Sequence, residues 1–456
     1  MDAASDALAR AADLTHGAEQ AFGDRPGVVR EARATAGELA FVLGDWRATT
    51  DLLDALAGDE DPDVDYRVGV ALTQAHRGQR DDPGLDRGRA LLARLHEREP
   101  RADVVASLAG SWKGIDDERA LGLYREALDL DPGNPYALGN VIELEAASTG
   151  AMPPLTAMRS SFEAAGRRCR TQVDRGEDLP WSCFDLAKFS LLAGDADEAF
   201  SAGCLGVARS TARFMIETSL RSLERFARLD PSLAGLDRVI GCYRLGLAGV
   251  FPASGGEDRL AGSATPGASP LAWPVIVVAG GSSREAADEI GRHAATIVAA
   301  MTGRSGTLIS GGTRQGVSAI AGDVAEGVQG VRAVGYLPAD IPGDVEVDAD
   351  VGRYAELRRT EGADFSVAEA LRYWADVLAS GMSPTDVRLL AIGGGPISAA
   401  EYRLALALGA SVGAIRGSGG AAAALLGDPW WAASSRLVEV SPETEALGDF
   451  FDAGKD

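Results

Sequence analysis

Hydrophobic positions in the first 250 residues recur at helical spacing, and short glycine-containing or polar breaks separate the runs. Between Arg30 and Leu56, two such runs flank the turn Gly44-Asp45, which predicts a helix, a turn and a second helix. A spacing of about 34–40 residues between pairs is typical of a helical solenoid. The first half is therefore predicted to be an all-α helical-repeat domain, with further pairs at Tyr66–Glu99, Val104–Leu130 and Phe184–Ala208.

Beyond residue 273 the pattern changes to short apolar runs that alternate with longer amphipathic runs. Alternation of this kind predicts a mostly parallel, doubly wound sheet with helices on both faces. The short runs predict strands at Val275–Ala279, Thr307–Ser310, Ala333–Leu337, Arg388–Ile392, Ser411–Arg416 and Arg436–Val440. The longer runs predict helices at Arg284–Met301, Val317–Gly327, Val367–Ser380, Ala399–Leu408 and Gly420–Leu426.

A change of composition separates the two halves. Residues 251–273 are rich in Pro, Gly, Ser and Ala, which is typical of a linker or an irregular surface crossing. We therefore predict an all-α domain at residues 1–250, a linker at 251–273 and an α/β domain at 274–456.

The chain is strongly acidic, with a formal net charge of −23. This charge argues against binding to nucleic acids or anionic membranes, although backbone N–H groups can still hold a small anion locally. No apolar run reaches the roughly 18 residues that span a bilayer. The acidic start, Met1-Asp2-Ala3-Ala4-Ser5-Asp6, lacks the basic region of a signal peptide. We expect a cytoplasmic protein.

Cysteine and histidine residues do not predict a metal site. The four cysteines form no CxxC pair and the four histidines are scattered along the chain. We expect free, buried thiols rather than disulfides or a zinc site at Cys169, Cys183, Cys204 and Cys242.

Two predicted strands end in glycine-rich breaks that lead into helices. The first break is Gly280-Gly281-Ser282-Ser283-Arg284, and the second is Gly311-Gly312-Thr313-Arg314-Gln315-Gly316. In a parallel sheet both breaks lie at the carboxyl edge, where open α/β sheets bind ligands. Glycines let the backbone approach an anion, the first N–H groups of a helix point at it, and Arg284 and Arg314 add cationic donors. An ordinary strand–helix turn is the alternative.

A third break, Gly393-Gly394-Gly395, follows the predicted strand Arg388–Ile392. Ser398 and Glu401 then have the spacing of a capping box, which is one interpretation of both residues. The alternative is that Glu401 contacts ribose hydroxyls or acts as a general acid or base at the sheet edge. The three breaks, with Ser398 as a further ligand contact, together predict a phosphate or nucleotide site built mainly of backbone.

One segment of the first half resembles the tetratricopeptide repeat. Ala120, Tyr124, Ala127 and Pro132 stand at that family's second-helix and terminal-proline spacing. The resemblance implies a concave groove for a peptide or a partner protein. A helical scaffold that binds nothing itself is the alternative interpretation.

The second half resembles the SLOG superfamily, which includes DprA/Smf-type and LOG-type members, over about residues 274–442. The resemblance rests on the three breaks and on Tyr354–Thr360, and the second break looks most like the nucleotide-sensor branch found in TRPM channels. It implies a Rossmann-like domain that binds a nucleotide-derived ligand of the ADP-ribose, NAD or cyclic-nucleotide class. It also implies a homo-oligomer and a role in prokaryotic defence or stress signalling. Arg358 and Arg359 are candidate anion partners.

The LOG-type enzymes of this superfamily cleave the N-glycosidic bond of nucleoside monophosphates. Of their Pro-Gly-Gly-x-Gly-Thr-x-x-Glu signature, Gly394, Gly395 and Glu401 match, and Ser398 replaces the threonine. The proline and the third glycine are replaced, the latter by Ile397, and the upstream catalytic segment is absent. These departures favour a ligand sensor. A phosphoribohydrolase with Glu401 as its catalytic residue and a non-catalytic interaction scaffold are the alternatives.

Overall fold

The computed structural model describes residues 2–22, 25–58, 61–252, 263–282, 290–341, 345–347 and 352–453. The chain divides into two compact units, Met1–Arg168 and Cys169–Asp456. The second unit thus contains several helices of the predicted repeat domain together with the sheet. The predicted boundaries at residues 250 and 273 coincide with the change from helices to the strands of the sheet. As limits of separate domains they stay predictions.

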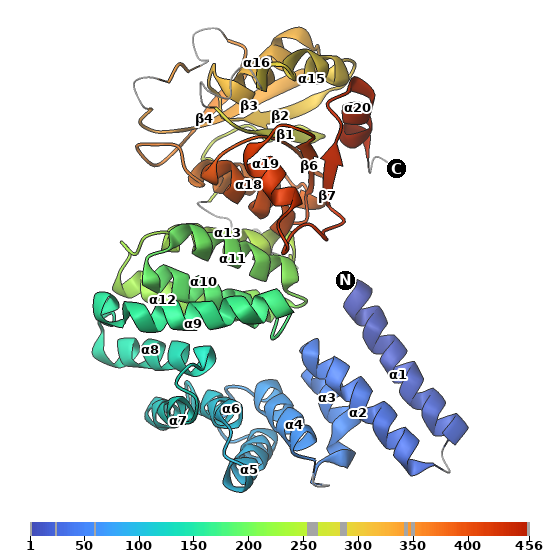
Figure 1. Cartoon of the computed structure of the whole chain (residues 1–456), viewed down its shortest axis with the longest axis vertical. Helices are drawn as coiled ribbons and strands as arrows, with labels where there is room; N and C mark the ends of the chain where they lie inside the picture. Colours follow the sequence, from blue (N-terminus) through green and yellow to red (C-terminus); the bar gives the residue numbers. More distant parts are fainter. Residues whose placement is uncertain are drawn as a thin grey trace. The chain divides into compact units, whose positions relative to one another are not determined.

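The first unit consists of helices that pack in succession along the chain (Figure 1). Polar caps at the turns define where successive helices begin. Asp45, Asp116 and Asn134 each accept a backbone N–H at the start of a helix. The predicted helical repeats are therefore confirmed. The helices are α1 (Asp2–Phe22), α2 (Pro26–Val42), α3 (Trp46–Leu53), α4 (Pro62–Ala75), α5 (Pro83–Arg98), α6 (Ala102–Trp112), α7 (Asp117–Leu130), α8 (Pro135–Thr149) and the first part of α9 (Leu155–Arg175), whose last turns belong to the second unit, with a short 3₁₀ turn at Asp54–Leu56.

The residues that resemble the tetratricopeptide repeat form the core of this unit. Ala120, Tyr124 and Ala127 are buried on one face of α7, where they meet apolar side chains of α6 and α8. Small residues at the crossing let the helices approach closely, which is why alanine occupies two of the three positions.

The second unit begins with four helices of the same kind. They are α10 (Trp181–Ala193), α11 (Ala196–Arg209), α12 (Arg213–Leu229) and α13 (Leu236–Gly249). Gly194 ends α10 with a φ of 88° and Asp195 caps α11, so the predicted helix pair at Phe184–Ala208 is confirmed. The four cysteines of the chain are buried and are thiols rather than disulfides.

A seven-stranded, entirely parallel sheet follows, as predicted. Its strand order is β4-β3-β2-β1-β5-β6-β7. The strands are β1 (Val275–Gly280), β2 (Gly306–Ser310), β3 (Val331–Pro338), β4 (Glu356–Thr360), β5 (Arg388–Ile392), β6 (Ser411–Ile415) and β7 (Leu437–Val440). The helices are α15 (Ala294–Met301), α16 (Gly316–Gly327), α17 (Ala368–Ala379), α18 (Pro396–Ala407), α19 (Gly420–Leu426) and α20 (Thr444–Asp452). Strand β4 and helix α20 were not predicted.

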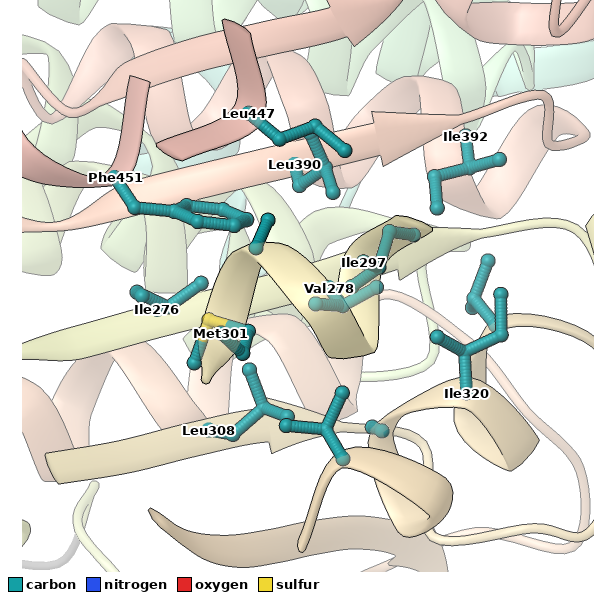
Figure 2. Packing of buried hydrophobic residues seen from close by; sticks show 14 of the residues in the cluster. Ile276, Val278, Ile297, Met301, Leu308, Ile320, Leu390, Ile392, Leu447 and Phe451 are labelled. Carbon is teal, nitrogen blue, oxygen red and sulfur yellow. The ribbon is translucent and has the colours of Figure 1, made fainter. Parts of the chain in front are cut away.

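Helices cover both faces of the sheet, as Figure 1 shows for α15 and α16 on one side and α18 and α19 on the other. Figure 2 shows the first face, where β1, β2 and β5 meet α15, α16 and α20 in one apolar cluster. On the second face, α11 packs against α18 and α13 packs against α17. Gly241 of α13 makes this packing close, because a Cβ there would lie 3.0 Å from Leu371 of α17. The helices α11 and α13 thus form a third layer over α17 and α18.

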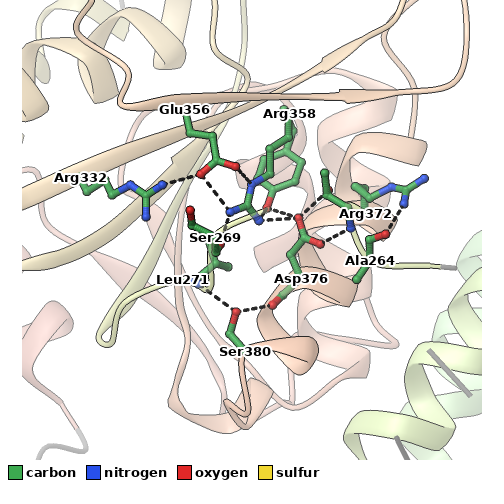
Figure 3. A network of polar contacts seen from close by, with 11 residues as sticks. Ala264, Ser269, Leu271, Arg332, Glu356, Arg358, Arg372, Asp376 and Ser380 are labelled. Atoms are coloured by element: carbon green, nitrogen blue, oxygen red, sulfur yellow. Dashed lines mark hydrogen bonds and ion pairs between the residues drawn. The ribbon is translucent and has the colours of Figure 1, made fainter. Parts of the chain in front are cut away.

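A buried polar network ties part of the predicted linker to the sheet (Figure 3). Asp376 of α17 accepts the backbone N–H of Thr265 at 2.6 Å and its hydroxyl at 2.8 Å. Arg358 of β4 donates to the carbonyl of Ser269 at 2.6 Å, and Leu271 donates its N–H to Ser380 at 2.9 Å. Residues 263–272 are therefore an ordered part of the sheet domain rather than a free linker. Among the residues that the structure describes, no helix is long and apolar enough to cross a membrane.

Candidate functional site

The strand order places the predicted ligand site between β1 and β5. The chain moves from β1 outward through β2, β3 and β4, and then returns to place β5 on the other side of β1. Open α/β sheets bind ligands at the carboxyl ends of the strands where the order reverses in this way. The loops that leave β1 and β5 at that point are the first and third glycine-rich breaks.

Gly280 brings the β1 loop against the end of β5. Its φ is 154°, and a Cβ at this residue would lie 2.0 Å from the carbonyl oxygen of Ile392. The next residue, Gly281, donates its N–H to that same oxygen at 3.1 Å. The predicted site residues Gly280 and Gly281 thus lie beside β5, and Ser282 lies against Gly316 of the β2 loop, whereas Ser283 and Arg284 lie outside the described residues.

The β2 loop packs against the β1 loop rather than standing free beside it. Gly316 has a φ of 56°, and a Cβ there would lie 2.2 Å from the carbonyl oxygen of Gly281. The N–H of Val317, at the start of α16, donates to this oxygen at 3.2 Å. That helix N-terminus therefore already has one protein acceptor.

The remaining predicted residues of the β2 loop are used in packing. Gly312 lies against Leu357 and Gly335, on the side of β3 and β4. Thr313 is buried and forms an antiparallel bridge with Val347. A Cβ added to Gly311 would lie 2.8 Å from the hydroxyl oxygen of Ser318. Arg314 is exposed; its N–H donates to the carbonyl of Glu346 at 2.9 Å, and its guanidinium lies 3.7 Å from the Glu346 carboxylate.

The β5 loop presents N–H groups that find no acceptor among the residues that the structure describes. The carbonyl oxygens of Gly393 and Gly394 accept the N–H groups of Ala422 and Ala421, at 2.9 Å each, in the first turn of α19. Because carbonyl and N–H point in opposite directions across a trans peptide, the N–H groups of the residues that follow each carbonyl point away from α19. Among the described residues, no group accepts from the N–H groups of Gly394, Gly395, Ile397 and Ser398.

These N–H groups lie at the start of α18, whose N-terminus carries a partial positive charge. Gly395 precedes the helix and Pro396 is its first residue, so only one N–H is missing from the run. Gly395 and Ile397 are exposed, and Ile397 retains 42% of its accessible surface. An open loop of this kind can hold an anionic group through backbone alone.

The capping-box interpretation of Ser398 and Glu401 is wrong. Helix α18 is preceded by Gly395, and Ser398 lies in its first turn instead of before it. The buried hydroxyl of Ser398 donates to the carbonyl of Gly280 at 3.1 Å. A serine inside the first turn can reach a neighbouring strand, and here it ties α18 to the end of β1.

Glu401 lies between α17 and α18. Its Oε1 accepts the hydroxyl of Tyr373 at 3.0 Å. The residue keeps some accessible surface, but its carboxyl group is enclosed by protein. Burial raises the pKa of Glu401 to about 7, the Tyr373 hydrogen bond partly opposes this shift, and the charge of Glu369 adds to it. A carboxyl group that titrates near neutrality can donate or accept a proton at working pH.

Replacing Glu401 by glutamine should change how stability depends on pH. The wild-type pKa is about 7 in the fold against an ordinary 4.5, so the native state holds a proton that the unfolded chain releases. The resulting stability is complete below pH 4.5 and is lost as pH rises through 7. Since each pKa unit is worth about 1.4 kcal/mol, Glu401→Gln should be more stable than wild type at pH 8 by roughly 1–3 kcal/mol. Urea unfolding at pH 4.5, 6, 7 and 8 measures the difference.

The matched control for this experiment is Glu445→Gln, which removes a carboxylate from the exposed first turn of α20. Identical changes in the pH profiles of Glu401→Gln and Glu445→Gln would show that enclosure of Glu401 between α17 and α18 does not cause the pH dependence of stability.

The structure does not place Arg358 at the site. Its guanidinium has five N–H donors, and all five are used within the fold. The acceptors are Glu356 (2.9 and 3.2 Å), Tyr336 (3.0 Å), Asp376 (2.7 Å) and the carbonyl of Ser269 (2.6 Å). Burial alone would lower the pKa of Arg358, but the hydrogen bonds and charges of Glu356 and Asp376 outweigh it and raise the pKa. The expectation that Arg358 is an anion partner is corrected to a structural role.

Arg359 lies on the exposed side of the edge strand β4 and donates to the carbonyl of Pro338 at 3.0 Å. Strands β3 and β2 separate it from β1. It is at the carboxyl edge of the sheet but not beside the loops of β1 and β5.

Two residues of this region were not predicted from the sequence. Tyr402 of α18 donates to the carbonyls of Ala279 and Gly393, both at 3.2 Å, and Ser418 accepts the N–H of Gly393 at 3.0 Å. The signal for Ser418 was present, because it lies in a fourth glycine-rich break, Gly417-Ser418-Gly419-Gly420, after the predicted strand Ser411–Arg416. Tyr402 has no local signal, since an interior helical tyrosine is ordinarily a core residue.

Comparisons with known proteins add no functional assignment. No protein-family model matches this chain, and no curated protein matches it. Among solved structures, a mutant O-GlcNAc transferase from Thermobaculum terrenum is similar at 12% identity, over 87% of this chain and 90% of that chain, with a TM-score of 0.16. A TM-score this low carries no argument about this chain. The fold described above rests on the strand order and helix packing of the protein itself: a helical-repeat region followed by a parallel α/β sheet.

Proposed function

We propose that the protein is a receptor for a nucleotide-derived anionic ligand, which binds at the carboxyl ends of β1 and β5. The observation that carries the proposal is the run of N–H groups at Gly394, Gly395, Ile397 and Ser398, none of which has an acceptor within the described part of the chain. It lies where the strand order reverses, the position at which open α/β sheets bind nucleotides. The resemblance to the SLOG superfamily at the same loops supports this ligand class.

A site built of backbone N–H groups can bind an anionic ligand even though the protein carries a large negative net charge. The net charge of −23 repels polyanions at the average surface, but a phosphate at the start of α18 would meet aligned N–H dipoles at short range. The site that we propose differs from the sequence-based one in that the β2 loop supports the β1 loop, and the ligand contacts the β1 and β5 loops.

Glu401 supports a second candidate function, a nucleotide N-glycosidase. Its carboxyl group belongs to the same helix that offers the N–H groups, and its pKa of about 7 suits a general acid. Against this candidate, Arg358 is occupied within the fold and cannot supply a catalytic cation. We therefore favour binding without turnover.

The helical repeats would contribute a protein-binding surface, and ligand binding would be relayed to them. The packing of α11 on α18 and of α13 on α17 offers direct contact between the site-bearing helices and the last repeats. A role in a prokaryotic defence or stress response, cytoplasmic location and homo-oligomerisation belong to the same proposal and rest on the superfamily resemblance.

Binding can be tested with AMP, ADP-ribose, NAD and cyclic AMP, by thermal shift and by calorimetry on the full chain. We expect one of these compounds to bind and to raise the melting temperature. Ile397→Asp should weaken that binding about tenfold or more, because it places a negative charge beside the N–H groups at the exposed first turn of α18. The same charge interacts favourably with the helix N-terminus, so the fold should not suffer.

The matched control is Ile397→Asn, which has nearly the same shape as the aspartate variant but no charge. Equal affinities of the two variants would show that the anion does not bind at the start of α18. Release of free base from AMP or NAD by wild type, but not by Glu401→Gln, would show that the N-glycosidase candidate is correct. Failure of all four compounds to bind wild type would contradict the proposed ligand class.

A further inference from the structure

Three buried hydroxyl groups lie in a row beneath the glycine-rich loops and connect the ends of three neighbouring strands. Ser398 donates to the carbonyl of Gly280 at the end of β1. Tyr402 bridges the ends of β1 and β5 through the carbonyls of Ala279 and Gly393.

Ser418 extends the row to β6. It accepts the N–H of Gly393 at 3.0 Å and donates to the carbonyl of Ile415 at 2.9 Å. Ser398, Tyr402 and Ser418 retain 6%, 0% and 7% of their accessible surface, so none is placed to be a surface contact.

These hydroxyls add side-chain hydrogen bonds to backbone groups at the base of the loops. The peptide that joins Gly393 to Gly394 shows the consequence most clearly. Its carbonyl is held by Tyr402 and by the N–H of Ala422, so its N–H must point the opposite way, toward the open side of the loop. The N–H of Gly393 is itself taken by Ser418, which leaves it unavailable to a ligand.

The glycines permit this arrangement, but they do not enforce it. Gly393 and Gly394 have φ values of 59° and 94°. Glycine adopts positive φ values about as readily as negative ones. A loop with such freedom needs external hydrogen bonds to keep one peptide orientation. The hydroxyls supply those bonds from the rigid helix α18 and from the end of β6.

We propose that Ser398, Tyr402 and Ser418 are positioning residues, which hold the ends of β1, β5 and β6 together and set the direction of the N–H group at Gly394 without touching the ligand. This inference rests on the proposed ligand-binding function of the same loops. It assigns Ser398 an inward role, where the sequence pattern predicted a ligand contact, and it adds Tyr402 and Ser418 to the residues that determine affinity.

The test compares Tyr402→Phe and Ser418→Ala with wild type by amide hydrogen exchange of the full chain. In Tyr402→Phe, we expect the N–H group of Ala422 to exchange about tenfold faster, because the Gly393 carbonyl to which it donates loses the hydrogen bond from Tyr402. Binding of ADP-ribose, the probe, should weaken at least about fivefold in each variant, with kinetics and melting temperature measured alongside.

The control is Tyr243→Phe. Tyr243 is buried at 1% exposure in α13, and its hydroxyl has no hydrogen-bond partner among the described residues. This variant removes the same atom from an equally buried tyrosine, so any general effect of losing a buried hydroxyl appears in it as well.

The two proposals fail in different ways. Unchanged exchange of Ala422 in Tyr402→Phe, or equal acceleration in Tyr243→Phe, would overturn the positioning role. Faster exchange in Tyr402→Phe together with no binding of ADP-ribose by wild type would support positioning and contradict this probe as the ligand. Faster exchange with unchanged ADP-ribose affinity would overturn the claim that loop orientation controls binding.

Discussion

Replacing Arg358 by methionine should lower the free energy of unfolding of the sheet domain by about 3–5 kcal/mol, the usual cost of removing one partner of a buried ion pair. Arg358 and Asp376 retain 3% of their accessible surface each and lie 2.7 Å apart. Methionine fills much of the space, but it leaves the Asp376 carboxylate without its cation and the Ser269 carbonyl without its donor. Urea-dependent amide exchange of peptides from β3 and β4 measures the change in the sheet separately from the helical repeats.

Arg359→Met is the matched control, because Arg359 is the next residue on the same strand and is exposed. Its replacement should change stability by no more than about 0.5 kcal/mol, as is usual at surface positions. If Arg358→Met is as stable as Arg359→Met and loses nucleotide binding, Arg358 is an anion partner after all and its structural role is disproved.

Replacing Gly280 by alanine should be the most damaging single change in the candidate site. The added Cβ would lie 2.0 Å from the Ile392 oxygen and 2.9 Å from its carbonyl carbon, and both atoms are backbone that cannot rotate away. Strain at such a φ costs roughly 1–3 kcal/mol, and overpacking costs roughly 1–3 kcal/mol more. We expect β1 and β5 to separate at their carboxyl ends and nucleotide binding to be lost, measured by urea unfolding and calorimetry.

Gly291→Ala provides the comparison. A Cβ at Gly291 would meet no atom within 4 Å, and its φ is not in the left-handed region. This variant should retain both stability and binding. A Gly280→Ala protein that keeps wild-type stability would mean that the end of β1 does not lie against β5 as described.

The fold class could be predicted from the sequence because its signals are local. Helical periodicity with capped turns at Asp45 and Asp116 defines the repeats, and short apolar runs define six of the strands. The edge strand β4 was missed for a physical reason. Its sequence Glu-Leu-Arg-Arg-Thr has no apolar run, and Arg358 becomes a core residue only through acceptors contributed by α17 and by residues 263–272.

The candidate site could be predicted only in part. The glycine-rich breaks at Gly280 and Gly393 were recognised, and the strand order brings them together. The break at Gly311–Gly316 gives the same pattern in sequence but is used to support the β1 loop, as shown by the approach of Gly316 to Gly281. A glycine-rich motif indicates that the backbone has no room for a side chain at that position. It does not indicate whether a ligand or a neighbouring peptide lies against the glycine.

By itself, the sequence determined most of the helices and strands, and it placed glycine at the ends of β1, β2 and β5, where backbone comes close to backbone. These properties depend on residues within a few positions of each other, so they can be read along the chain. The tertiary structure alone decided which N–H groups of the glycine-rich loops find no acceptor among the described residues. It also decided that the charge of Arg358 is balanced by carboxylates of the fold, and that the hydroxyls of Ser398 and Tyr402 donate to buried carbonyls. Those outcomes depend on hydrogen-bond partners from distant segments, and which partner a polar group finds is set only when strands and helices are packed together.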